Sequence, residues 1–307
     1  MTTNAIQSSH IYSTYFAPRG RSRIYTLGMQ IAQLYLSPFD QIIGFIGEAG
    51  SGKSVLIKGM FPGIELTNDD DGVNVRPLPL LEQEYETGFF TPHTYHLDIR
   101  FETGFHQLSE LADAVRLAVR RGKRIIIEHF DLIYPLLGVN ANLLIGVGEQ
   151  IVITRPNLFG PLPQELCDIV YPSLAYRLMA HSAEDLCEYA MTQEQMLACS
   201  HGDIRHGFVL EFNEHQPDID IPTLEARVNE LIRQDLPIDY YDESHILLGG
   251  AQHYCTGPRT HVRSTGRIIG FRLLDHFIYD HFHKTYMLVG CVGDDSEENI
   301  RKLETIH

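Results

Sequence analysis

The first half of the chain alternates short apolar runs with helical patterns. Apolar residues recur at helical spacing over 24–36 and 108–118. Short, β-branched apolar runs separate these segments and predict buried strands. The alternation predicts an α/β domain, a parallel sheet with flanking helices. The predicted strands are 41–46, 93–100, 123–129, 143–145 and 151–153.

The pattern changes in the second half of the chain. Residues 155–172 are rich in proline and lack clean periodicity, so the sequence places a domain boundary there and predicts domains over 1–160 and 173–307. Helical spacing follows over 174–190 and 224–232. Together with several short strand patterns, it predicts a second domain of the α+β class. Those strands are 208–212, 245–249, 267–274 and 285–292.

One loop between the first predicted strand and a helix carries a phosphate-binding motif, G-x-x-x-x-G-K-S/T. Its residues are Gly47, Glu48, Ala49, Gly50, Ser51, Gly52, Lys53 and Ser54. In such loops glycines let backbone N–H groups point at an anion, and the following helix N-terminus adds its positive dipole end. Lys53 is expected to reach the β- and γ-phosphates, and the Ser54 hydroxyl to bind magnesium. The expected cofactors are ATP and Mg²⁺.

Four carboxylates are candidate partners of that loop. Glu128 ends the strand 123–129, where an acidic side chain can organise magnesium; Asp131 is the alternative, and an ordinary surface glutamate is the simpler interpretation. Asp98 ends the strand 93–100 and is a candidate base. Asp70 is a second candidate base, although an acidic run at this place is also typical of a solvated turn.

Charge and cysteine content narrow the class of partner. With 40 acidic and 24 basic side chains the formal net charge is −16, which disfavours general attraction to a polyanion such as tRNA. Five cysteines without a scaffold spacing favour a reducing, cytoplasmic setting over a disulfide framework. The chain shows neither a leader-like start nor about 18 unbroken apolar residues, so no membrane partner is expected. The basic cluster Arg19, Arg21 and Arg23 is typical of a solvated entry to a helix, and a phosphate or RNA contact is the alternative.

The rear half resembles a known family. Residues 225–237 read Glu-Ala-Arg-Val-Asn-Glu-Leu-Ile-Arg-Gln-Asp-Leu-Pro, and 255–261 read Cys-Thr-Gly-Pro-Arg-Thr-His, followed by Ser-Thr-Gly-Arg-Ile-Ile-Gly over 264–270. From about 175 to 292 this order resembles the second additional domain shared by alanyl- and threonyl-tRNA synthetases and the free-standing alanyl-tRNA editing proteins. The resemblance implies an α+β fold and an aminoacyl-ester function.

The resemblance also implies a zinc site at four positions, which are His181, Asp185, Cys255 and His261. Here an aspartate stands where the family has its second histidine, and five residues instead of three separate Cys255 from His261. All four side-chain types can bind zinc, and His253 could substitute for one of them. The alternative is a decayed site with core polar residues. His201 and His206 form a weaker metal alternative.

The front half resembles uridine-kinase-like phosphotransferases and the small ATPase of the bacterial threonylcarbamoyl-adenosine tRNA-modification system. The resemblance rests on the loop, the His-x-Asp-x-Arg of 96–100 and the Ile-Ile-Ile-Glu of 125–128. The first functional hypothesis is therefore an ATP-dependent phosphotransferase or ATPase that acts on, or is gated by, a small aminoacyl or nucleoside-like ligand. A metal-dependent aminoacyl-tRNA hydrolase and a nucleotide-gated binding module are the alternatives. The sequence leaves the oligomeric state open.

Overall fold

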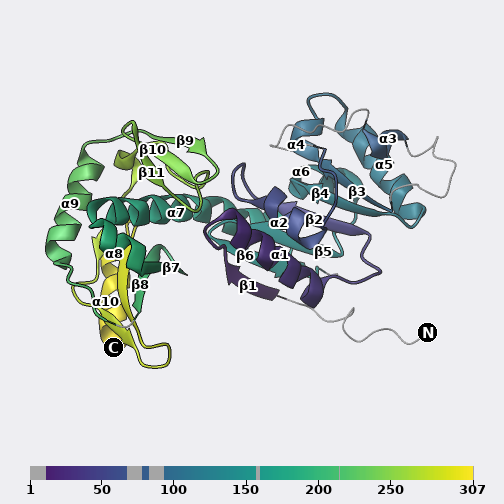
Figure 1. Cartoon of the computed structure of the whole chain (residues 1–307). Helices are drawn as coiled ribbons and strands as arrows, with labels where there is room; N and C mark the ends of the chain where they lie inside the picture. Colours follow the sequence, from purple (N-terminus) through teal and green to yellow (C-terminus); the bar gives the residue numbers. More distant parts are fainter. Residues whose placement is uncertain (1–11, 68–77, 83–92, 157–159, 214, 307) are drawn as a thin grey trace. The chain divides into compact units, whose positions relative to one another are not determined.

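The computed structural model describes residues 12–67, 78–82, 93–156, 160–213 and 215–306 (Figure 1). The chain forms two compact units. The first unit holds Met1–Tyr15 and Ser22–Tyr171, and the second holds Phe16–Arg21 and Pro172–His307. The short segment Phe16–Arg21 therefore belongs to the second unit, although both of its flanks belong to the first.

A six-stranded sheet organises the first unit, in the order β1-β6-β5-β2-β4-β3. Strands β3, β4, β2 and β5 are parallel neighbours, as the sequence predicts. The prediction that the last run extends the parallel sheet is wrong, because β6 pairs with β5 antiparallel. Only Gly148 and Glu149 connect these two strands, and a parallel connection needs a crossover of a dozen or more residues. The strands are β1 Tyr12–Phe16, β2 Ile42–Ile46, β3 Thr94–Asp98, β4 Arg124–Glu128, β5 Leu143–Val147 and β6 Gln150–Thr154.

Helices pack on this sheet through apolar residues. The central strands β2 and β5 are buried along their whole length, which explains why their sequences are apolar runs instead of alternating patterns. Gly44 in β2 permits a close approach, since a Cβ there would lie 2.7 Å from Cγ of Phe130. The helices are α1 Arg21–Tyr35, α2 Lys53–Met60, α3 Pro79–Glu82, α4 Ile99–Glu102, α5 Leu108–Arg120 and α6 Phe130–Leu137.

The strand register places the predicted site residues at one edge of the sheet. Phe45 of β2 pairs with Glu128 of β4, and Glu128 pairs in turn with Asp98 of β3. Since the three strands are parallel, the loop that leaves β2 starts beside both carboxylates. The order of the strands, which the sequence pattern does not specify, creates this arrangement.

A long helix, α7 Pro163–Ala190, occupies most of the proline-rich stretch. The stretch 155–172 lacks clean periodicity in sequence, yet only its first part lies outside the helix. Pro163 is the first helical residue, where a missing N–H costs nothing, and Pro172 lies inside the helix. The two units divide between Tyr171 and Pro172, within this helix.

The second unit contains α7 beyond Pro172, further helices and two antiparallel sheets. One sheet has the order β11-β10-β9, and the other β12-β14-β8-β7 with β13 also on β14. The prediction of a strand over 267–274 is wrong in its first part: Thr265–Arg267 forms a 3₁₀ turn, Gly270 takes a left-handed φ of +63°, and only Arg272–Leu273 pairs. The elements are α8 Gln193–Ala198, β7 Cys199–Ile204, β8 Gly207–Asn213, α9 Ile221–Arg233, β9 Ile238–Asp242, β10 His245–Leu248, β11 Ala251–Tyr254, β12 Arg272–Leu273, β13 Ile278–Asp280, β14 Thr285–Cys291 and α10 Ser296–Ile306.

Among the helices of the described ranges, none combines the length and the apolar content that crossing a membrane requires.

Candidate functional site

The predicted phosphate loop, residues 47–54, connects β2 to α2 (Figure 1). Helix α2 begins at Lys53, and its N-cap Gly52 has a left-handed φ of 93°. Gly50 is also left-handed, with a φ of 79°. These values are strained for residues with a Cβ, so the glycines allow the chain to turn directly into the helix N-terminus. A tight glycine loop at a helix N-terminus is suited to bind an anion.

The ammonium group of Lys53 lies over this loop. Its Nζ donates hydrogen bonds to the carbonyl oxygens of Gly47 and Glu48, each at 2.9 Å, and lies 3.8 Å from Oε2 of Glu128. Burial lowers the pKa of Lys53, and the negative charges of Glu128 and Asp98 oppose that shift. The side chain is buried, and its ammonium group contacts polar atoms of the loop and Glu128.

Glu128 receives hydrogen bonds from two sides. Ser54 Oγ donates to Oε1 at 3.3 Å, and His96 Nε2 lies 3.1 Å from the same oxygen. The backbone N–H of Thr67 donates to His96 Nδ1 at 3.1 Å, so a neutral His96 carries its proton on Nε2 and donates it to Glu128. Burial opposes ionisation, but His96 and Lys53 outweigh it and lower the pKa of Glu128. Glu128 is therefore an ionised acceptor beside Ser54.

The residues at this edge of the sheet fit a magnesium ion. Ser54 Oγ and Glu128 Oε1, both oxygen atoms, lie 3.3 Å apart, and Mg²⁺ prefers oxygen ligands. The alternative carboxylate, Asp131, accepts a hydrogen bond from Tyr171 Oη at 3.3 Å. His96 is not among the site residues that the sequence predicts, although the period-two pattern of the strand 93–100 places it on the same face as Asp98.

The two candidate bases differ in what the structure describes. Asp98 is buried at the end of β3, and its carboxylate caps α4 by accepting the backbone N–H of Phe101 at 3.1 Å. Its negative charge acts on Lys53. Asp70 lies outside the described residues.

A buried polar cluster occupies the second unit, and Arg19 is part of it. The prediction that Arg19 is solvated is wrong, because the residue is 1% exposed. Its guanidinium donates to Glu184, to Asp185 and, at 3.2 Å, to Sγ of Cys255. Burial opposes the charge of Arg19, but Glu184 and Cys255 outweigh it and raise the pKa of Arg19 above its ordinary value. Long-range contacts of this kind leave no local pattern in the sequence.

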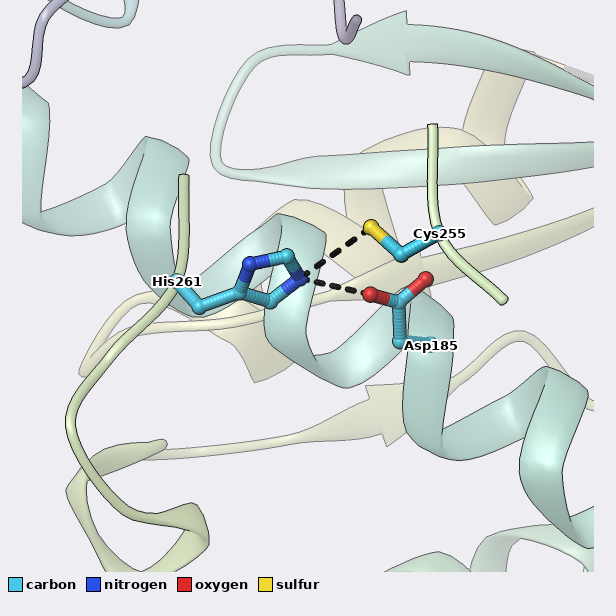
Figure 2. A group of neighbouring side chains, drawn as sticks. All are labelled: Asp185, Cys255 and His261. Carbon is cyan, nitrogen blue, oxygen red and sulfur yellow. Dashed lines mark hydrogen bonds and ion pairs between the residues drawn. The ribbon is translucent and has the colours of Figure 1, made fainter. Parts of the chain in front are cut away.

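Three of the four predicted zinc ligands, Asp185, Cys255 and His261, meet in the second unit (Figure 2). Arg19 donates hydrogen bonds to the first two. His261 Nε2 lies 2.5 Å from Asp185 Oδ2 and 3.7 Å from Cys255 Sγ, while His261 Nδ1 lies 3.3 Å from the carbonyl oxygen of Pro258. Both the carboxylate and the sulfur approach the same ring nitrogen, so the three are not arranged as a proton relay. Burial, followed by the charge of Arg19, lowers the pKa of His261 to about 3, which favours the neutral ring that binds metals.

This donor set of oxygen, sulfur and nitrogen fits zinc, and the Pro258 carbonyl would fix the ring of His261 as metal-binding histidines require. The fourth predicted ligand, His181, is not in the group; its Nε2 lies 3.5 Å from Asp203 Oδ1. His253 instead groups with Asp185 and Glu188.

His201 and His206, the weaker metal alternative, contact different residues in the structure. His201 Nδ1 lies 2.8 Å from Glu184 Oε1 and groups with Glu184 and Glu188. His206 stacks on Tyr176, with ring centroids 3.7 Å apart, and pairs with Asp295 at 3.1 Å. Of the two, His201 alone belongs to a group that could hold a metal within the described chain.

Acid is expected to destabilise the second unit through His181. Burial is the main cause that lowers the pKa of His181, to about 4. The positive charges of Arg177 and Arg19 lower this pKa further, whereas Asp203 and Glu184 raise it. Unfolded histidine titrates near about 6.5. Between these values the unfolded chain binds the proton and the folded chain does not, so stability is present above about pH 6.5 and is lost as pH falls towards 4.

From pH 7 to pH 5 this loss should amount to about 1–2 kcal/mol in urea unfolding. The His181→Gln variant should lose less stability than wild type over the same interval. The control is His276→Gln, whose side chain is 52% exposed and should leave the pH dependence as in wild type. An identical pH dependence in wild type and His181→Gln would contradict the expectation.

No protein-family model matches the chain, and no curated protein sequence matches it.

Proposed function

We propose that the chain is a magnesium-dependent ATP-binding protein, a phosphotransferase or ATPase, whose second unit holds a small aminoacyl or nucleoside-like ligand. One observation carries this proposal: Lys53 and Ser54, adjacent in the glycine loop, both meet Glu128 of the neighbouring strand. A cation for phosphate, a hydroxyl and an ionised carboxylate for magnesium, and backbone N–H groups at a helix start are the parts that phosphoryl transfer requires.

Each residue of the site would have a separate role in binding ATP and magnesium. The loop amides and Lys53 would bind the β- and γ-phosphates, exchanging the carbonyl contacts of Lys53 for phosphate oxygens. Ser54 and Glu128 would hold magnesium, which supplies charge neutralisation on the phosphates when bound. His96 would keep Glu128 ionised and oriented. Asp98 would accept the proton of an acceptor hydroxyl; Asp70 is the other proposed base.

The first test is nucleotide turnover. Purified protein with ATP and Mg²⁺ should release ADP, and a panel of nucleosides, amino acids and tRNA should contain a molecule that changes the rate. Loss of the magnesium ligand in Ser54→Ala should lower turnover by about 10–100-fold while ATP binding without Mg²⁺ changes little. Ser109→Ala, on the exposed face of α5, is the matched control. Wild-type turnover in Ser54→Ala would refute the assigned role.

A second candidate function is hydrolysis of an aminoacyl ester. The observation that favours it is the convergence of Asp185, Cys255 and His261, because three protein ligands leave the open coordination position of catalytic zinc sites. A mischarged tRNA should then be deacylated by wild type and not by Cys255→Ser. Equal deacylation rates in the two proteins would dismiss this function.

A further inference from the structure

Three buried carboxylates lie on α7 in the second unit, two on adjacent residues and the third one turn further along the helix. The side chains of Glu184, Asp185 and Glu188 are 1%, 2% and 5% exposed. Arg19 donates to the first two. Buried carboxylates are stable as anions only beside compensating charge. Three carboxylates against one guanidinium leave more acidic groups than Arg19 alone can pair, and His201 Nδ1 approaches two of them, Glu184 at 2.8 Å and Glu188 at 3.2 Å. A divalent cation would neutralise negative charge in this cluster.

Glu188 and His253 provide a second, independent observation. Within the part of the chain that the structure describes, Glu188 Oε1 and His253 Nε2 are buried atoms without a hydrogen-bond partner. His201 Nδ1 lies 3.2 Å from Glu188 Oε1 but outside hydrogen-bond geometry. Buried polar atoms of this kind usually have a partner, so both atoms are available to a bound ion or water.

The distances suit a shared ion. His253 Nε2 lies 4.0 Å from Glu188 Oε2, too far for a hydrogen bond. Two ligand atoms that are each about 2.1 Å from one metal ion lie about 3–4 Å apart. Asp185 completes the group, since one ligand atom from each of Asp185, Glu188 and His253 lies within 4.8 Å of the others. All three residues are buried.

We propose that Asp185, Glu188 and His253 form a divalent-cation site of their own, beside the group of Asp185, Cys255 and His261. Two carboxylates and one imidazole, with no thiolate, suit Mn²⁺ or Fe²⁺ as well as Zn²⁺. Asp185 belongs to both groups; a carboxylate has about four acceptor positions, so contacts with Arg19 and His261 leave others for an ion. This site does not depend on nucleotide binding by the first unit.

The test is Mn²⁺ binding by the full chain after removal of metals with a chelator, followed by electron paramagnetic resonance. Wild type should bind an Mn²⁺ ion whose affinity falls at least about ten-fold in Glu188→Gln and in His253→Gln, since each loses a ligand. Cys255→Ser and Ser54→Ala should retain it, which separates this ion from the thiolate group and from the loop of the first unit. Glu243→Gln, whose side chain is 61% exposed, is the matched carboxylate control.

Two results would overturn the site: unchanged Mn²⁺ affinity in Glu188→Gln, or loss of the ion in Ser54→Ala. Circular dichroism and thermal unfolding check that each variant is folded. If the variants are unfolded, the electron spin echo envelope of the wild-type Mn²⁺ complex decides. The absence of modulation from a directly bound imidazole nitrogen overturns the site. Its presence supports an ion bound by histidine, a ligand that Ser54 and Glu128 do not supply.

Discussion

Arg19→Ala is expected to destabilise the protein by about 3–5 kcal/mol, the usual cost of removing one partner from a buried ion pair. The guanidinium donates to Glu184 and Asp185, both buried, and to Sγ of Cys255 at 3.2 Å. Its removal leaves the carboxylates without their cation in a site that water does not reach. They must then take up protons or the second unit must open. Urea unfolding followed by circular dichroism measures the loss.

A matched arginine distinguishes this effect from the loss of any positive charge. Arg21 lies two residues further along, its side chain is 48% exposed, and it pairs with Glu243 at 3.4 Å. An exposed pair contributes about 0–1 kcal/mol, so Arg21→Ala should be mild. Hydrogen exchange measured by mass spectrometry should show the Arg19→Ala effect in peptides from the second unit. Equal stabilities of the two variants would show that the buried contacts contribute little.

Lys53→Ala is expected to lower ATP affinity by at least about 100-fold, equivalent to about 2.7 kcal/mol. The reason is the loss of a charge-assisted hydrogen bond to phosphate from a site partly shielded from water. Folding should persist, because the contacts that Nζ makes are with the loop carbonyls of Gly47 and Glu48 and with Glu128, which retains His96. Binding of a fluorescent ATP analogue measures the affinity, and circular dichroism measures the fold.

Lys58→Ala provides the control within the same helix, since it removes an equal charge from outside the loop. Its ATP affinity should stay within about two-fold of wild type. Wild-type affinity in Lys53→Ala would reject the nucleotide assignment for the whole first unit. Reduced affinity together with a lost circular dichroism signal would instead assign Lys53 to folding.

Local patterns predicted much of the first unit and less of the second. The strand before the loop and the short helix after it appear where the sequence places them, because burial and the break at Pro62 are local properties. The sequence predicts β6 as the strand 151–153 but not its antiparallel direction, because an apolar run of residues carries no direction. The first turns of α7 are not evident from the sequence, because 155–172 lacks clean periodicity, although Pro163 starts the helix.

The candidate sites divide in the same way. The loop motif is contiguous, so its eight residues were found directly, whereas His96 joins Glu128 only through the order of strands β2, β4 and β3. In the second unit Asp185, Cys255 and His261 come together as the resemblance implies, while His181 does not join them. Arg19, Glu184 and Glu188 are not among the residues that the sequence predicts for this cluster. A contact between residues 165 positions apart cannot be predicted from the local spacing of residues.

The course of the backbone bears on how this protein could be divided. The chain enters the second unit at Phe16, leaves it after Arg21 and returns at Pro172. A six-residue segment from the N-terminal part of the chain therefore supplies Arg19, which pairs with the buried carboxylates of the second unit. A gene fragment that encodes 172–307 alone would specify Glu184 and Asp185 without Arg19. If the chain is split at that point, the fragment 172–307 should become stable only when a second polypeptide that contains Phe16–Arg21 is added to it. A recombination event that exchanged either half would have to carry that hexapeptide with it.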